Sequence, residues 1–128
     1  MSVTTNQDRA LTGTNGQRVT QILPDPYGNK SVNNYLNPAA FALPAMGTFG
    51  NSGAGSILGP GYWQFDAAIS RTILIRESKK LEFRAEAFNV TNAFHMENPT
   101  TNLNSNIFGQ VTSARDPRIM QFVLKYFF

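Results

Sequence analysis

The sequence of 128 residues contains no cysteine, a single histidine and few charged side chains, and each shortage excludes a class of site. Without cysteine there can be no disulfide, thiolate zinc site, iron–sulfur cluster or cysteine nucleophile. The lone His95 cannot form a histidine cluster. Charged residues make up 15% of the chain, and no basic run is longer than Lys79-Lys80. This pattern does not favour nucleic acid as a partner.

Long apolar runs are also missing. No stretch approaches the ~20 apolar residues of a membrane-spanning helix. The polar start, MSVTTNQD, lacks the basic and apolar regions of a secretory signal, so we expect no signal peptide in this chain. Turn-forming residues are instead abundant, with 10 glycines and 7 prolines, and they exclude a helical bundle.

Changes in composition predict three regions along the chain. Residues 1–16 are polar and patternless, and we expect an arm there. Residues 17–61 should hold a weak strand, Gln17 to Leu23, which Pro24 ends, and then a long loop rich in Gly, Pro and Asn. Residues 62–128 should form an antiparallel β-sheet.

Alternation of apolar and polar residues predicts four strong strands in this last region. They are Tyr62 to Ile75, Lys80 to Thr91, Ile107 to Ala114 and Arg118 to Phe128. We therefore expect an all-β fold of antiparallel strands joined as hairpins, four strong and one weak. Several of these strands have 11 or more residues, which is longer than the ~5–6 of ordinary strands and close to the ~9–11 that cross a bilayer.

The same alternation separates two faces of the predicted sheet. The apolar face should carry Trp63, Phe65, Ile69, Leu81, Phe83, Phe122, Leu124, Tyr126 and Phe128. On the opposite face, Glu82, Arg84 and Glu86 should form a ladder of charges, since residues two apart on a strand are neighbours. An acid/base pair of the two glutamates is the less favoured interpretation, and we expect no catalytic residue, cofactor or metal site.

Four segments carry a resemblance to a known family: LNPAAFALPAMGTFGNSG, GPGYWQFDAAISRT, LEFRAEAFNVTNAFH and FGQVTSARDPRIMQFVLKYFF. Together they resemble the C-terminal barrel strands of TonB-dependent outer-membrane receptors, in the Oar-like group with a carboxypeptidase-regulatory-like plug. The resemblance implies that Phe122, Leu124, Tyr126 and Phe128 match the terminal signal read by the barrel-assembly machinery. The expected location is the bacterial cell envelope or the cell exterior, and the outer membrane if the chain belongs to such a receptor.

The chain also departs from such receptors, which have a plug and roughly 22 strands. Five strands cannot close a barrel, so both edges of the sheet would be open to another chain. Counting back from a last strand that ends in the periplasm places the turn at Arg115-Asp116-Pro117 outside, the connection Asn92 to Asn106 inside and the turn Arg76 to Lys79 outside. Loop length predicts the reverse, because periplasmic turns are usually the short ones.

Three functional hypotheses follow from this pattern. The favoured one is a non-enzymatic structural protein that assembles with copies of itself, through its strand edges, into a multi-chain barrel, tube or fibre. The second is a wall segment of a TonB-dependent transporter, with membrane lipid against its apolar face. The third is a soluble monomeric β-sandwich, in which a second sheet would cover that face.

Overall fold

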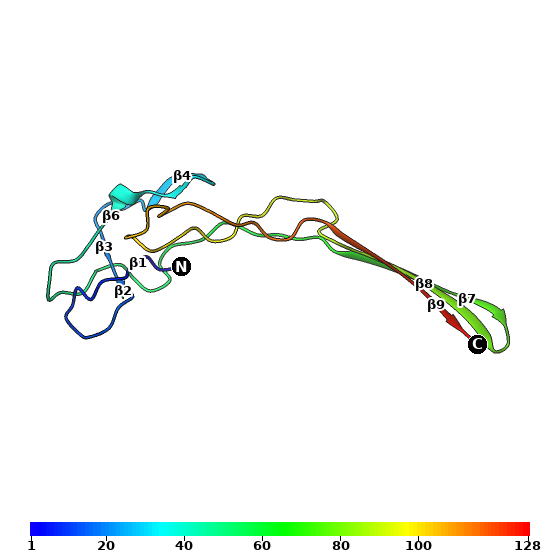
Figure 1. Cartoon of the computed structure of the whole chain (residues 1–128). Helices are drawn as coiled ribbons and strands as arrows, with labels where there is room; N and C mark the ends of the chain where they lie inside the picture. Colours follow the sequence, from blue (N-terminus) through cyan, green and yellow to red (C-terminus); the bar gives the residue numbers. More distant parts are fainter. The chain divides into compact units, whose positions relative to one another are not determined.

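The computed structural model describes all 128 residues and confirms an all-β chain of antiparallel strands without an α-helix (Figure 1). The chain divides into two compact units. The loop unit comprises Met1–Pro60 and Met96–Ala114, and the sheet unit comprises Gly61–His95 and Arg115–Phe128. The chain passes from one unit to the other after residues 60, 95 and 114.

The sheet unit is built on three long strands in the order β7-β8-β9. These strands are β7 (Ala67–Arg76), β8 (Lys79–Phe88) and β9 (Ile119–Phe127), and both pairings are antiparallel. A tight turn at Glu77 and Ser78 joins β7 to β8, whereas residues 89–118 separate β8 from β9. The sheet does not close on itself, as expected for so few strands.

Asn89 ends the ladder between β7 and β8. Its backbone has φ +51°, a left-handed conformation that leaves the strand path. Its side chain accepts a hydrogen bond from Ala93 N at 3.0 Å and donates to the Ala93 and Asp116 carbonyl oxygens. Because β8 stops there, the residues before Ala67 have no strand partner, although Phe65 O still accepts from Val90 N at 2.9 Å.

The expected strand boundaries therefore need correction. The strand expected from Tyr62 begins only at Ala67, which leaves Trp63 and Phe65 outside it, and the strand expected to end at Thr91 ends at Phe88. The last strand lies nearly where it was expected, at Ile119–Phe127.

The loop unit consists of very short strands around a small core. The strands are β1 (Thr4–Thr5), β2 (Gln17–Arg18), β3 (Thr20–Gln21), β4 (Tyr27–Ser31), β5 (Asn34–Leu36) and β6 (Phe41–Ala42), with one 3-10 turn, η1 (Pro38–Ala40). They pair as β1-β2, β3-β6 and β4-β5. The core contains Val3, Val19, Tyr35, Leu36, Ala40, Phe41, Ile57, Phe108 and Val111.

Two expectations for the loop unit are wrong. Residues 1–16 are not a bare arm, because Val3 and Thr5 are fully buried and β1 pairs with β2. The expected weak strand over Gln17 to Leu23 is split into β2 and β3, which pair with different partners.

The strand expected over Ile107 to Ala114 is also absent. Gly109 has φ +75°, and a Cβ there would lie 2.5 Å from the carbonyl oxygen of Leu36. Phe108 and Val111 pack into the core of the loop unit, while Ala114 forms only an isolated bridge with Met96. Their apolar pattern reflects core packing of an irregular segment and not a sheet face.

Asp8 organises the loop between β1 and β2, and this arrangement depends on pH. Its carboxylate accepts hydrogen bonds from the Thr12 and Gly13 backbone N–H groups and from the Gln17 amide, and the Thr12 N–H contributes most to lowering the pKa of Asp8. Because the pKa of Asp8 is lowered, its ionised carboxylate stabilises the folded loop at pH values above the usual Asp range. This stabilisation is lost as the pH falls through the lowered pKa. We expect the Thr12 and Gly13 amide NMR signals to shift together on acidification. In Asp8→Asn this pH-dependent shift should disappear; persistence of the shift would contradict the assignment.

Candidate functional site: a two-faced sheet with open edges

The apolar face of the β7-β8-β9 sheet is built from residues that stand opposite one another across the strands. The register gives four successive rows: Ala67–Ala87–Met120, Ile69–Ala85–Phe122, Arg71–Phe83–Leu124 and Ile73–Leu81–Tyr126. Only Arg71 interrupts the apolar surface. We call these rows the apolar face.

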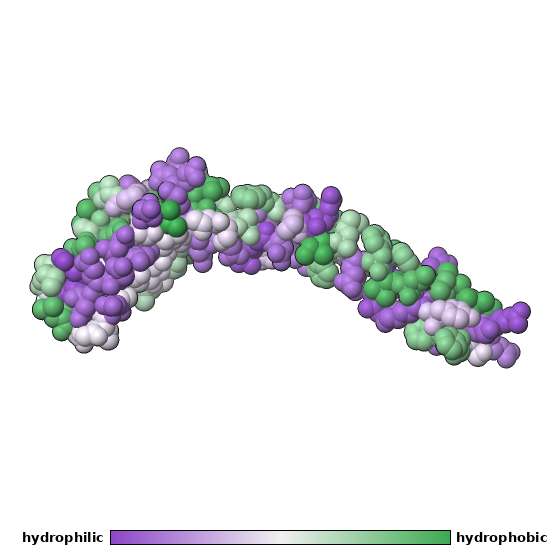
Figure 2. Space-filling view, in the orientation of Figure 1, coloured by the Kyte–Doolittle hydropathy of each residue, from purple (hydrophilic) through white to green (hydrophobic).

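Nothing within the sheet unit covers the apolar face. Ile69 is 68% exposed and Leu124 is 67% exposed, and Figure 2 shows apolar surface gathered over this part of the molecule. Burying a side chain of this size is worth about 1.5–3 kcal/mol. The sheet is thus a single layer whose largest apolar surface lacks a cover, which is not the arrangement of a β-sandwich.

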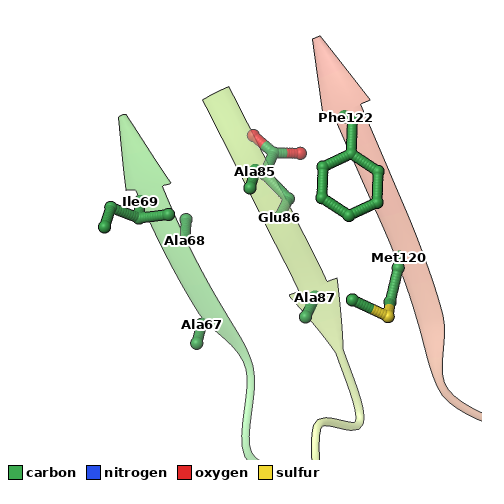
Figure 3. A pocket seen from close by; sticks show the side chains of 8 residues that line it. All are labelled: Ala67, Ala68, Ile69, Ala85, Glu86, Ala87, Met120 and Phe122. Carbon is green, nitrogen blue, oxygen red and sulfur yellow. The ribbon is translucent and has the colours of Figure 1, made fainter. Parts of the chain in front are cut away.

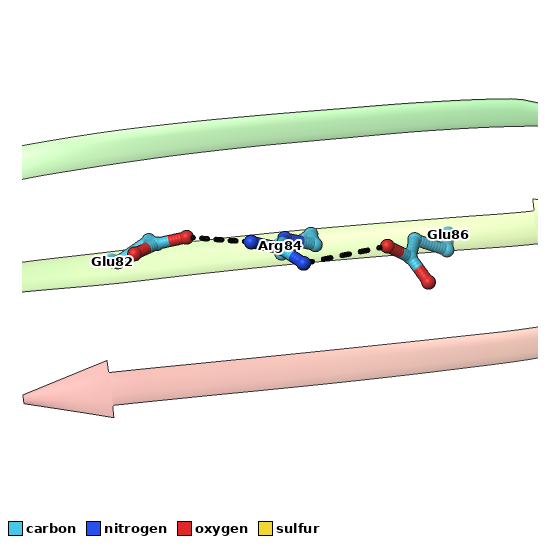
Figure 4. A network of polar contacts seen from close by, with 3 residues as sticks. All are labelled: Glu82, Arg84 and Glu86. Atoms are coloured by element: carbon cyan, nitrogen blue, oxygen red, sulfur yellow. Dashed lines mark hydrogen bonds and ion pairs between the residues drawn. The ribbon is translucent and has the colours of Figure 1, made fainter.

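The opposite face carries the charge ladder in its middle, whereas Leu74 and Phe127 make one end of it apolar and Phe88 and Ile119 the other. Arg84 lies between Glu82 and Glu86, with its Nη2 3.1 Å from Glu82 Oε1 and its Nη1 3.7 Å from Glu86 Oε1 (Figure 4). Lys125 stands opposite Glu82 in the register. These pairs are partly exposed, so each contributes about 0.2–1 kcal/mol at most. The ladder defines a hydrated face.

The two outer strands each have one unpaired edge. Strands β7 and β9 pair only with β8, so their outer N–H and C=O groups find no partner within the sheet. An apolar solvent cannot satisfy these groups, and in a bilayer such an edge must be paired. Within a bilayer, the sheet would therefore require additional strands at both sides.

The two ends of the sheet differ. At one end lie the Glu77-Ser78 turn and the end of β9, where Tyr126 stacks on Phe128 with ring centroids 5.9 Å apart. At the other end, the chain enters β7, leaves β8 and enters β9 through long segments. Phe128 is 94% exposed.

A polar and aromatic cluster at the long-segment end was missed by sequence reasoning. His95 is buried, its Nε2 has no hydrogen-bond partner, and its ring lies edge-on to Tyr62 and Trp63 at 5.2 and 6.0 Å. The Arg115 guanidinium lies 4.3 Å from the centre of the Tyr62 ring. The expected aromatic residue Trp63 thus belongs to this cluster. Its members are far apart in the sequence, so no local sequence pattern predicts that they form a cluster.

The apolar face contains one hollow (Figure 3). Alanine side chains from β7 and β8 lie along it, and the larger side chains Ile69, Glu86, Met120 and Phe122 lie beside them. The lining residues are Ala67, Ala68, Ile69, Ala85, Glu86, Ala87, Met120 and Phe122.

The lengths of the three strands match those of strands that cross a bilayer. The strands have 10, 10 and 9 residues, which matches the ~9–11 residues of a tilted strand in a bilayer. No helix of the structure has the length and apolar character needed to cross a membrane. Tyr62 and Trp63 lie at one end of the sheet and Tyr126 lies at the other. This placement matches the aromatic girdles of membrane barrels.

Comparison with protein families matches residues 1–121 to the outer membrane beta barrel domain. Comparisons with curated proteins and with solved structures give no match. The family match covers most of the chain, and the long strands with one apolar and one polar face have the features of such a wall. The chain therefore belongs to the outer membrane β-barrel domain family, which supports a barrel-type protein of the outer membrane.

Proposed function

We propose that the chain is a non-enzymatic wall segment of a TonB-dependent outer-membrane transporter of the Oar-like group. The order of the connections carries this proposal. Glu77 and Ser78 form a short turn at the end of the sheet where β9 ends, whereas long segments lie at the other end. Membrane barrels have short periplasmic turns and longer extracellular loops.

This order removes the conflict that the sequence alone produced. With Ile107 to Ala114 no longer a strand, counting back from a β9 that ends in the periplasm places the Glu77-Ser78 turn in the periplasm too. The long connection over residues 89–118 is then extracellular. Loop length and strand count now agree.

The faces take matching roles in this proposal. The apolar face contacts lipid, and the ladder of Glu82, Arg84 and Glu86 lines the hydrated interior. Further barrel strands pair with β7 and β9. Phe122, Leu124, Tyr126 and Phe128 alternate along and just beyond β9, and they serve as the signal for the barrel-assembly machinery. The TonB dependence rests on the resemblance of the four sequence segments.

Single cysteines test the orientation, because this chain contains no cysteine and any cysteine elsewhere in the barrel can be replaced. Thr112 and Ser78 are both exposed, one in the loop unit and the other in the β7-β8 turn. In intact cells, a membrane-impermeant maleimide should label Thr112→Cys but label Ser78→Cys only after the outer membrane is permeabilised. The opposite pattern would overturn the proposed orientation.

Transport is tested by the cell's uptake profile. Deletion of the protein and depletion of TonB should abolish uptake of the same solutes, because a TonB-dependent transporter needs both. Solutes lost only on deletion of the protein would show a barrel that works without TonB.

A second candidate function, self-assembly of copies, has its own supporting observation. Strand β9 (IMQFVLKYF) has no proline or glycine, and its outer edge is open. Such an edge pairs readily with a strand of another chain, and head-to-tail pairing gives closed rings or open filaments. Native particle mass without detergent separates the two candidates. A large detergent-free particle would support copies, whereas a requirement for detergent would support the membrane wall.

A further inference from the structure

Arg71 is the one charged residue in the rows of the apolar face, and it lies near the middle of its strand. It is the fifth of the ten residues of β7. A basic side chain that faces lipid at mid-membrane weakens a barrel about a hundredfold in the folding equilibrium, whereas near the headgroups the effect is small. On the wall proposed above, Arg71 therefore needs a partner of opposite charge or a route to water.

The sheet itself contains no such partner for Arg71. Arg71 stands opposite Phe83, and its neighbours along β7 on the same face are Ile69 and Ile73. Glu82 is next to Phe83 in the chain but lies on the opposite face, where another arginine binds it. No ion pair of the structure includes Arg71, which is exposed. The compensating charge must therefore come from outside this sheet.

The place of Arg71 on an edge strand shows where the partner can lie. Strand β7 has an open outer edge, which must pair with another strand within a bilayer. Residues directly opposite each other on antiparallel strands share a face and have Cβ atoms about 4.5–5.5 Å apart. A carboxylate opposite Arg71 on the added strand would thus meet the guanidinium on the apolar face itself.

A second copy of this sheet does not have the required residue. Copies could pair only through the open edges of β7 and β9. Strand β7 (AAISRTILIR) contains two arginines and β9 (IMQFVLKYF) contains one lysine, and neither strand has an acidic residue. Charge complementarity at Arg71 therefore favours a strand of different sequence.

We propose that the strand pairing with the outer edge of β7 is the next strand of the same barrel and carries an aspartate or glutamate directly opposite Arg71. Each charge of this ion pair compensates the other at mid-membrane. The pair also fixes the register of the two strands, because a shift by one residue would turn the carboxylate to the other face. The inference rests on the proposed membrane wall, and it adds the chemistry of the partner at one edge of that wall.

The variant Arg71→Leu in the full-length barrel gives opposite results with and without this partner. With the partner, the variant leaves a carboxylate unpaired in lipid, and we expect its folding equilibrium to fall at least about tenfold. Without the partner, the variant replaces an unpaired charge with an apolar side chain and becomes more stable. The folded fraction is measured by heat-dependent gel migration during urea titration in phosphatidylcholine vesicles. Arg76→Leu, at the end of the same strand, is the control and should change stability little.

Pairs of cysteines identify the residue opposite Arg71. Arg71→Cys is combined with a cysteine at successive positions of the other barrel strands, after any native cysteine of the barrel has been replaced. A disulfide forms only where the two backbones lie as close as paired strands do, and we expect it at a position that holds an acidic residue in the unaltered protein. Replacing that acidic residue with leucine should restore the stability of Arg71→Leu, because both charges are then absent. This rescue also separates a lost ion pair from a general folding defect.

Each other outcome overturns the inference in a distinct way. Greater stability of Arg71→Leu, or a disulfide only at an apolar position, would show an unpaired arginine on a membrane wall, so the proposed function would stand. Unchanged stability of Arg71→Leu, with Leu124→Asp still preventing insertion, would show that the guanidinium extends to the headgroups. If neither variant changes folding, the face does not meet lipid, and the proposed function fails too. A disulfide between two copies of Arg71→Cys would show that β7 pairs with itself in an assembly of copies.

Discussion

Replacing Leu124 with aspartate should abolish stable insertion of the barrel, whereas the same replacement of its neighbour Val123 should leave insertion nearly unchanged. Leu124 belongs to the apolar face in the middle of the sheet. Its side chain is 67% exposed in the chain alone and is therefore free to contact lipid. The variant loses the burial of a leucine and places a carboxylate in an apolar medium. Together these cost about 3 kcal/mol or more, which exceeds a hundredfold in the folding equilibrium.

Val123 is the control because it is the neighbouring apolar residue of β9 and lies on the other face of the sheet. It lies on the polar face, opposite Arg84, so an aspartate there gains a favourable neighbour. The measurement is the fraction of protein that shows heat-dependent migration in gels of outer membranes. Equal tolerance of Leu124→Asp and Val123→Asp would show that the two faces have been exchanged or that neither meets lipid.

The register also shows why Phe83, although central on the same face, gives a weaker test. Phe83 stands directly opposite Arg71. An aspartate at position 83 would face that guanidinium, and the resulting ion pair would offset part of the cost. The long side chain of Arg71 can also extend toward the membrane surface. Leu124 is separated from Arg71 by β8 and has no such compensation.

The sheet could be predicted from sequence because its information is local. Alternation with a period of two is sustained along Lys79–Phe88 and Ile119–Phe127, and it fixes which residues share a face. The antiparallel register then brings Ile69, Ala85 and Phe122 into one row. The charge ladder follows from the same period, since Glu82, Arg84 and Glu86 alternate on β8.

The loop unit could not be predicted in this way because its order comes from contacts between distant residues. Strands of two residues are too short to show a period, and Thr20 pairs with Ala42 across a long stretch of chain. The apolar residues of Ile107 to Ala114 predict a strand, yet Phe108 and Val111 pack into a core made by other segments. The predicted start of β7 and the predicted end of β8 were wrong for a related reason. Asn89 has a left-handed backbone, which stops the pairing of these two strands.

The final prediction concerns the outer edge of β9, which must pair with another strand in the assembled protein. The N–H groups along a strand point alternately to its two sides. In the isolated sheet only those facing β8 are bonded, so every second amide of β9 should exchange rapidly with deuterated water. In the assembled barrel all nine residues of β9 should be protected.

Proline at two adjacent positions tests this pairing, because Phe122→Pro and Val123→Pro remove donors that point in opposite directions. The variant that loses the donor facing β8 should weaken the β8-β9 pairing and raise amide exchange in β8. The other variant should leave β8 protected but block the partner strand, so that no closed barrel or larger particle forms. If assembled particles of unchanged size form from both variants, or if alternate β9 amides still exchange freely after assembly, no strand pairs with this edge. Such a result would exclude a barrel wall in lipid. An unpaired edge of β9 would expose backbone groups to lipid, and each of these groups costs several kcal/mol there.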